Sequence, residues 1–157
     1  MKIQWIFCLQ SLDFYADLEV LDLSHNSIDA LGKRHFESQI MLTSLNLSYN
    51  SLHYLEEQAF SGLTQLQVLD LRHNHLTRID DYVLGDLEEL TDLDLSFNSI
   101  EYLSSECFTS LYRLRSLNLN SNRLQMVILN SNQIERIRMI FQKRSKAFFR
   151  DKDRKKR

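Results

Sequence analysis

Hydrophobic residues recur along the chain with a period of 24, and five successive segments open with the same pattern, L-x-x-L-x-L-x-x-N-x-[LI]. The five segments begin at Leu18, Leu42, Leu66, Leu90 and Leu114. Further apolar columns follow at the same spacing, namely Leu31, Leu55, Ile79 and Leu103, then Phe36, Phe60, Leu84 and Phe108. A constant period of this length is typical of solenoid proteins, in which each repeat forms one coil of a stack.

Each Leu-x-Leu step predicts a short β-strand with one buried face. Alternate side chains of a strand point to opposite faces, so we expect Leu21 and Leu23 to point inward and the residue between them to face solvent. One such strand cannot bury its apolar face alone. We therefore expect stacked coils, with Leu21, Leu45, Leu69 and Leu93 in register on neighbouring parallel strands and the phenylalanine column filling the opposite side.

An asparagine follows each predicted strand at the same position of the repeat. The five side chains are Asn26, Asn50, Asn74, Asn98 and Asn122. An asparagine amide both donates and accepts, so it can satisfy backbone groups of the turn that would otherwise be buried without a partner. We expect these side chains to form a structural ladder along the stack, in which each unsatisfied group would cost about 1–3 kcal/mol.

The period breaks at both ends of the chain. Residues 1–17 enter in mid-repeat and predict either a partial N-terminal coil or a weak, signal-like segment. The segment from Leu124 to Ile134 repeats the opening pattern only ten residues after Leu114, too soon for two stacked coils. Either the solenoid is distorted there, or the second strand is poorly ordered or pairs elsewhere, or the gene product is truncated or mis-joined. We divide the chain into residues 1–17, a solenoid over 18–124, an irregular or truncated repeat over 125–142 and a basic tail over 143–157.

Composition adds a charge asymmetry to this picture. The chain has 157 residues and a formal net charge of −2. Residues 1–135 carry 8 basic and 19 acidic side chains, whereas residues 136–157 carry 11 basic and 2 acidic ones. The basic segment predicts a loosely ordered tail, a basic amphipathic helix for an anionic membrane surface or nucleic acid, or a segment that folds back on the acidic body.

Few features point to catalysis or to a cofactor. The chain has 3 glycines and no proline, and it contains no phosphate-binding loop, zinc-protease motif or nucleophile elbow. Its longest unbroken apolar run, Trp5 to Leu9, is too short to cross a membrane as a helix. Cys8 and Cys107 lie about four coils apart, beyond disulfide reach, so we expect two free thiols. We expect a protein that is not an enzyme and holds no metal or cofactor.

Two polar columns offer alternatives to that expectation. Asp70 and Asp94 occupy one solvent-facing strand position on successive coils, about 5 Å apart. They form either a carboxylate pair or cation site or, as we favour, an ordinary surface column. His25 and His73 share another column, but they lie two coils apart with Tyr49 between them, which disfavours metal binding.

The solvent-facing residues of the predicted strands and strand ends form the candidate ligand surface. Tyr49, His73 and Phe97 form an aromatic stripe across successive coils, and exposed aromatic residues on a rigid surface are good interface anchors. The alternative is that these rings pack against the neighbouring asparagine turns. The predicted protein-binding residues are Tyr49, Val68, Asp70, Arg72, His73, Asp92, Asp94 and Phe97.

Over about residues 12–124 the chain resembles the leucine-rich-repeat family, in the 24-residue variety found in animal receptors such as Toll-like receptors and chaoptin-like adhesion proteins. The resemblance rests on the five opening patterns and the phenylalanine column. It implies an α/β leucine-rich-repeat solenoid. This fold is a curved right-handed coil with a parallel β-sheet on the concave face and short 3₁₀ or irregular segments on the convex face.

The resemblance implies a non-catalytic recognition module of a receptor or adhesion protein, extracellular or at the cell surface, that binds a protein ligand on its concave face. Asn46 begins the sequence Asn-Leu-Ser and is then a candidate glycosylation site. An exposed end of the core near Leu117 and Leu119 would offer a surface for a homodimer. The alternatives are a cytoplasmic scaffold of the same fold and a binder of nucleic acid or an anionic membrane surface through the basic tail. We expect no small-molecule substrate.

Overall fold

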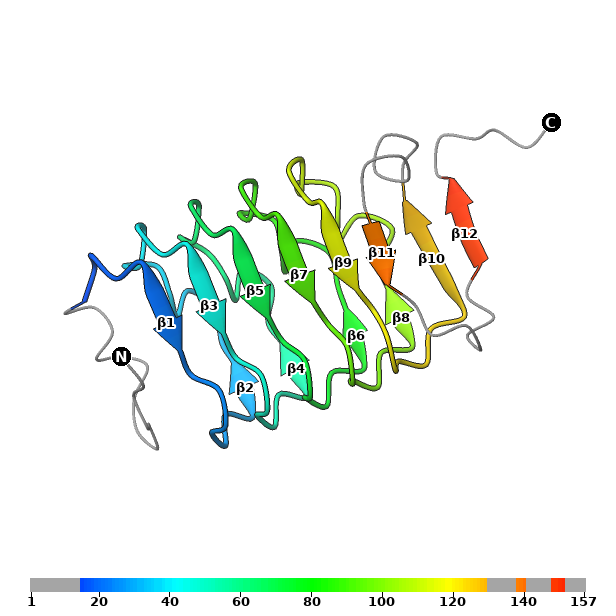
Figure 1. Cartoon of the computed structure of the whole chain (residues 1–157), viewed down its shortest axis with the longest axis horizontal. Helices are drawn as coiled ribbons and strands as arrows, with labels where there is room; N and C mark the ends of the chain where they lie inside the picture. The colour runs from blue at the N-terminus through cyan, green and yellow to red at the C-terminus, as the bar shows by residue number, and fades with distance from the viewer. Residues whose placement is uncertain (1–14, 130–137, 141–147, 152–157) are drawn as a thin grey trace.

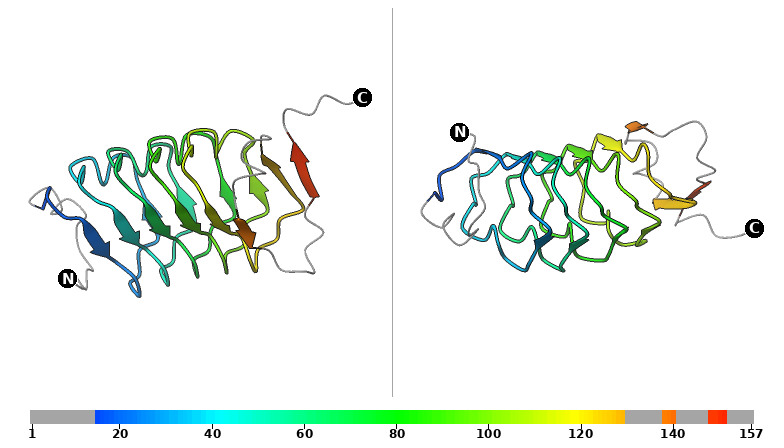
Figure 2. Two further views of the ribbon diagram at one scale, coloured as in Figure 1. Left: turned by 45° about the horizontal axis from the view of Figure 1, so that its top comes forward. Right: turned by 90° about the horizontal axis from the view of Figure 1, so that it is seen from below.

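The computed structural model of the chain describes residues 15–129, 138–140 and 148–151. These residues form a stack of coils in which each turn of the chain lies against the next along one axis (Figure 1). Two further views show that one strand of each coil belongs to a large sheet, while a second strand lies on another side of the coil (Figure 2). The predicted solenoid of parallel strands is confirmed.

A six-stranded parallel sheet forms one side of the stack, in the order β1-β3-β5-β7-β9-β11. Its strands are β1 (Val20–Asp22), β3 (Ser44–Asn46), β5 (Val68–Asp70), β7 (Asp92–Asp94), β9 (Ser116–Asn118) and β11 (Arg138–Ile140). The central leucines of the first five strands are buried and in register, namely Leu21, Leu45, Leu69, Leu93 and Leu117. This register is the one that the repeat predicts, because each leucine lies 24 residues after the last.

The remaining strands form three separate pairs rather than a continuous sheet. β2 (Ala30–Leu31) pairs with β4 (Tyr54–Leu55), and β6 (Arg78–Ile79) pairs with β8 (Tyr102–Leu103). β10 (Met126–Leu129) pairs with β12 (Phe148–Asp151). Turns connect these strands back to the six-stranded sheet, and no helix occurs within the described ranges. The irregular connecting segments agree with the fold that the repeat implies.

The core is a single cluster of leucines closed by a phenylalanine column on the side away from the sheet. Phe36, Phe60 and Phe108 are buried, and the rings of Phe36 and Phe60 stack with their centroids 6.3 Å apart. Cys107 is a buried free thiol, as expected, and its burial raises the pKa of the thiol. Burial thus makes this side chain a small core hydrophobe rather than a reactive thiolate.

The C-terminal irregularity lies in the length of the repeat, which is 22 residues between paired strands instead of 24. Val127 is buried and lies 24 residues after Leu103, so Met126–Leu129 occupies the second half of the fifth coil. This segment pairs with Phe148–Asp151 and does not enter the six-stranded sheet. The sixth strand of that sheet is Arg138–Ile140, whose Arg138 is the register partner of Ser116, 22 residues earlier. Of the alternatives left open by the sequence, the described residues show the one in which the second strand pairs elsewhere.

Several expectations concern residues that the structure does not describe. The partial coil or signal-like segment falls almost wholly on residues 1–14, and Cys8 lies there too. Most of the basic tail also falls outside the described residues. The described parts of the basic segment 136–157, Arg138–Ile140 and Phe148–Asp151, are strands, so the amphipathic helix considered for this segment is wrong at those residues. Among the described residues no helix is long and apolar enough to cross a membrane.

Candidate functional site

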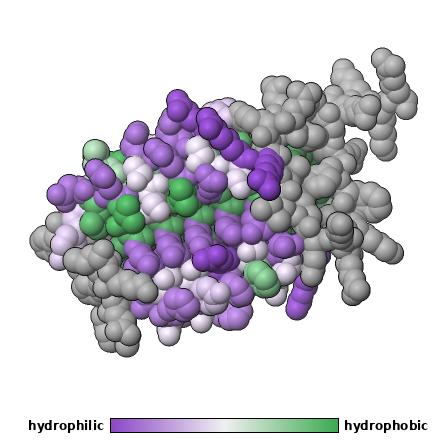
Figure 3. Space-filling view, viewed as in Figure 1, coloured by the Kyte–Doolittle hydropathy of each residue, from purple (hydrophilic) through white to green (hydrophobic). Residues whose placement is uncertain are grey.

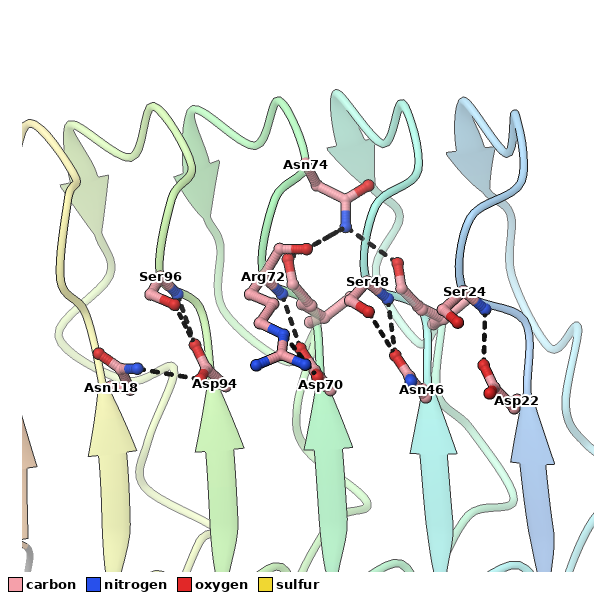
Figure 4. Close-up of polar contacts among 12 residues, drawn as sticks. Asp22, Ser24, Asn46, Ser48, Asp70, Arg72, Asn74, Asp94, Ser96 and Asn118 are labelled. Carbon is pink, nitrogen blue, oxygen red and sulfur yellow. Dashed lines mark hydrogen bonds and ion pairs between the residues drawn. The ribbon is translucent and has the colours of Figure 1, made fainter.

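The outward face of the six-stranded sheet, here called the sheet face, carries a column of five Asp and Asn side chains. They are Asp22, Asn46, Asp70, Asp94 and Asn118, one from each of the first five strands. In every case the side-chain Oδ1 accepts a hydrogen bond from the backbone N–H two residues later, at 2.8–3.1 Å. Figure 4 shows these bonds for the first four residues of the column. These side chains therefore shape the turn that ends each strand, which is a structural task.

The two adjacent carboxylates of this column are each bound within the protein. Asp70 forms an ion pair with Arg72, whose Nε lies 3.1 Å from Oδ2. Asp94 accepts a hydrogen bond from the Nδ2 of Asn118 at 2.9 Å, besides those from Ser96. Partial burial is the main cause that raises the pKa of Asp70, and the negative charge of Asp94 acts in the same direction. The described residues contain no group of three or more His, Cys, Asp or Glu side chains placed to hold a metal ion.

The asparagine column lies behind the strand ends and joins successive coils. The Nδ2 of Asn74 donates to the carbonyl oxygen of Leu47 on the preceding coil and to that of Leu71 on its own coil, both at 3.0 Å (Figure 4). Its Oδ1 accepts from the backbone N–H of Leu52 at 3.0 Å. Asn50, Asn98 and Asn122 make the equivalent bonds in their coils. One buried amide thus satisfies backbone groups of two coils at once.

A continuous stack of four aromatic rings lies between these two polar columns, at the residue just before each ladder asparagine. His25 stacks on Tyr49 with the centroids 4.4 Å apart, Tyr49 on His73 at 4.2 Å, and His73 on Phe97 at 4.3 Å. The planes of successive rings differ by 6–11°. Tyr49, His73 and Phe97 were expected to form a stripe, and they do so by packing face to face.

The backbone holds these rings in place. All four residues have a positive φ of 53–56°, a conformation that costs non-glycine residues roughly 1–2 kcal/mol. The N–H groups of Tyr49, His73 and Phe97 donate to carbonyl oxygens of the next coil, those of Arg72, Ser96 and Asn120, at 2.9–3.0 Å. The coil spacing therefore sets the ring spacing, and the inter-coil hydrogen bonds maintain the unusual backbone.

The predicted site residues share one side of the molecule but differ in exposure. Tyr49 is 41% exposed, Phe97 50% and Val68 41%, so each offers apolar surface to a partner. Arg72 and Asp92 are also exposed, whereas Asp70, His73 and Asp94 are only half-buried. In the orientation of Figure 3, apolar side chains gather over the N-terminal and central coils with polar side chains around them. Apolar and charged groups thus lie side by side on this surface.

The structure also adds residues that the sequence reasoning did not select. His25 is the first ring of the stack. Its position 24 residues before Tyr49 is the sequence signal that could have identified it. A second exposed column contains Tyr54, Arg78 and Tyr102, on strands β4, β6 and β8. The Arg78 guanidinium lies 5.4 Å from the centroid of the Tyr102 ring. These residues alternate with buried ones in two-residue strands, too short for the sequence pattern to identify.

Comparisons with known proteins agree with this geometry. The family model for the leucine-rich repeat matches residues 16–76 and 64–124. A TLR13 structure, solved as a complex with ssRNA13, aligns with a TM-score of 0.69 and 33% identity over 85% of this chain and 23% of its own. Toll in the Toll–Spatzle complex of Drosophila aligns in its glycosylated form with a TM-score of 0.66 and 33% identity over 68% of this chain and 14% of Toll. A second structure of that complex gives a TM-score of 0.65 and 32% identity over 72% of this chain and 15% of Toll.

These alignments show how much of each related structure this chain covers. The chain spans less than a quarter of the length of each of these solved proteins. No curated protein shows a significant match to it. The matched part of the chain is the repeat region, whose strands form the parallel sheet. Because the family match extends over residues 16–124 and the coils stack in that register, the chain belongs to the leucine-rich-repeat family.

Proposed function

We propose that this chain is a non-catalytic recognition module that binds a protein ligand on its sheet face. The ligand surface consists of exposed and half-buried residues of the strands and strand ends and of the last three rings of the stack. Its members are Tyr49, Val68, Asp70, Arg72, His73, Asp92, Asp94 and Phe97. Arg72 and the acidic side chains select the charge of the partner, while Val68 and the rings supply apolar contact area.

The ring stack is the observation that carries this proposal. Apolar rings that form a contiguous exposed patch often mark an interaction site. Here Tyr49 and Phe97 are held by a constrained backbone and by neighbouring rings, so a ligand has little side-chain motion to restrict. Binding to a preorganised surface loses less entropy than binding to mobile side chains.

The charge of the solenoid favours a protein ligand over a nucleic acid. Residues 15–129 contain 17 Asp and Glu side chains and 7 Lys and Arg side chains. Toll is solved with Spatzle and TLR13 with ssRNA13, so the structural relatives include both types of complex. An acidic surface repels phosphate groups, which usually dominate affinity for nucleic acid. A protein with a basic, partly aromatic surface complements this one.

The setting that fits this function is a receptor or adhesion protein at the cell surface. A glycan on Asn46 belongs to the same proposal. Asn46 lies on β3, and its Oδ1 accepts a hydrogen bond from the Ser48 hydroxyl at 2.7 Å. A glycan there would occupy the sheet face three residues before Tyr49. The ligand would then contact Tyr49 and the later coils rather than the strand residues of β3.

The test compares two double variants of the full chain. Tyr49→Ala with Phe97→Ala removes two rings from the stack, whereas Tyr82→Ala with Tyr112→Ala removes two exposed tyrosines elsewhere. Each immobilised protein is exposed to secreted and membrane-extracted proteins, and dissociation constants are measured for any protein that the unmodified chain retains. We expect the stack variant to weaken binding by at least about 100-fold and the control by less than about 3-fold. Equal losses in both variants, or none in the stack variant, would contradict the proposal.

A further inference from the structure

The stacked rings belong to a column of five residues with one backbone conformation. Its φ is 53–56° at His25, Tyr49, His73 and Phe97, and 54° at Ser121 on the next coil. Because the coils are in register, residues with the same backbone conformation project their side chains in the same direction. The first four positions carry a planar ring and the fifth carries a hydroxymethyl group. The column therefore continues beyond Phe97 without a ring of its own.

The Phe97 ring is held beside this fifth position. One of its faces stacks on His73 at 4.3 Å, and its backbone N–H donates to the carbonyl oxygen of Asn120, at 2.9 Å, next to Ser121. Among the described residues His73 is the one aromatic ring stacked on Phe97. Phe97 is 50% exposed, more than Tyr49, which has a ring on each face and is 41% exposed. A serine side chain is too small to cover an aromatic face.

We propose that the face of Phe97 turned toward Ser121 is the docking place for one aromatic side chain of the protein ligand. This inference rests on the proposed function and names the partner's chemistry at one point of the surface. Offset stacking of two rings is favourable beyond the area that it buries. The spacing of 4.2–4.4 Å and the small interplanar angles show that the coil geometry suits parallel rings. A ring from the ligand completes the series above Ser121.

The charged side chains near Phe97 determine which ligand residues can lie beside the docked aromatic ring. Asp92 is exposed and Asp94 is half-buried on the same coil as Phe97. The oxygens of Asp94 face Ser96 and Asn118, with no basic side chain paired to it among the described contacts. Basic residues beside the aromatic residue therefore strengthen docking, whereas the phosphates of a nucleotide weaken it. The preferred ligand segment is a tryptophan, tyrosine or phenylalanine next to arginine or lysine.

Short capped peptides test this inference on the full chain. The probes are arginine–tryptophan–arginine and arginine–leucine–arginine, which share charge and apolar character but differ in the planar ring. Amide chemical shifts are followed during titration of the ¹⁵N-labelled protein. We expect the tryptophan peptide to bind about 2- to 10-fold more tightly, the range that an aromatic pair contributes. The largest shifts should fall on the amides of Phe97 and Ser121, and the indole protons should move upfield.

Three variants locate the effect. Phe97→Ala removes the platform and Ser121→Tyr fills the place with the protein's own ring, so both should abolish the preference for tryptophan. Tyr82→Ala, at another exposed residue with positive φ, should retain it. Equal affinity for the two peptides, an unchanged preference in Ser121→Tyr, or tighter binding of a single-stranded RNA nonamer would overturn the inference. If the peptides fail while a protein ligand still depends on Tyr49 and Phe97, the docking place is wrong and the proposed function stands.

Discussion

The two sides of each coil are held together by different kinds of hydrogen bond. On the sheet side, coils bond to their neighbours, as when the N–H of Leu47 donates to the carbonyl oxygen of Asp70 at 2.8 Å. On the opposite side, many bonds close local turns, as when the N–H of Ala59 donates to the carbonyl oxygen of Glu56 at 3.0 Å. Accordingly, the strands on the sheet side form one continuous sheet, whereas the other strands form isolated pairs. The sheet side therefore sets the repeat, and the opposite side tolerates more variation between coils.

Replacing a ladder asparagine on the sheet side should cause the largest loss of stability. Asn74→Ala removes the amide that bonds to Leu47, Leu71 and Leu52 and leaves their backbone groups buried without it. We expect the free energy of unfolding to fall by about 3 kcal/mol, measured by urea denaturation. Ser61→Ala is the control on the opposite side, where an exposed hydroxyl bonds to Asp86 at 2.9 Å. It should lower stability by less than about 1 kcal/mol; equal losses would remove the difference between the two sides.

A glycine on the opposite side should give the next largest effect. Gly62 has a φ of +91°, and a Cβ there would lie 2.7 Å from the Cα of Glu37 on the neighbouring coil. Gly62→Ala should therefore destabilise the fold by about 2 kcal/mol, through backbone strain and a contact that cannot relax by side-chain rotation. Gly85→Ala is the matched control, because its Cβ would meet no backbone atom closer than 3.4 Å.

Thermal unfolding of the two glycine variants sharpens the comparison. The control should be neutral or up to about 1 kcal/mol more stable, since alanine restricts the unfolded chain. A loss of stability in Gly62→Ala would show that the opposite side does not tolerate a larger side chain where two coils approach closely. Similar midpoints for both variants would contradict the packing at Gly62.

The smallest expected effect concerns the polar column of the sheet face. Asn occupies this column at Asn46 and Asn118, so Asp70→Asn should preserve the turn that Oδ1 closes with the N–H of Arg72. Partial burial raises the pKa of Asp70 above its ordinary value, so the folded state binds the proton more tightly than the unfolded state. The contribution of this group to stability is then greatest below the ordinary pKa and declines as pH rises through the raised one.

Chemical denaturation at pH 3 and pH 7 measures this effect. The Asn variant lacks the ionisation, so its stability relative to the unmodified chain should increase from the lower to the higher pH, by less than about 1 kcal/mol because the ion pair is partly exposed. A relative decrease over that interval would show that the ion pair with Arg72 outweighs desolvation.

Most of the solenoid could be predicted because its causes repeat. Leu69 and Asn74 have the same neighbours as their equivalents 24 residues away, so one physical explanation serves every regular coil. The C-terminal pairing could not be predicted. Val127 fits both the start of a new strand pattern and the second half of the fifth coil, and hydrophobicity alone does not separate the two. The pairing with Phe148–Asp151 has the same 22-residue offset as the pairing of Arg138–Ile140 with Ser116–Asn118, an offset that the 24-residue period does not predict.

The candidate surface was partly predictable for a related reason. Spacing placed Tyr49, His73 and Phe97 on successive coils, but their contact depends on a positive φ at residues that rarely adopt it. Sequence patterns do not reveal that conformation for tyrosine or phenylalanine. The exposed Tyr54 and Tyr102 were missed because their strands contain only two residues each.

Amide hydrogen exchange most directly tests the claim that the sheet face is held rigid between coils. The amides of Tyr49, His73 and Phe97 donate to the next coil, whereas those of Ala59, Ser61 and Gly85 close local turns. We expect the first group to exchange at least about 10-fold more slowly in the folded chain, because opening these bonds requires separating two coils. Equal rates in the two groups would show that the sheet face is not held more rigidly than the opposite side.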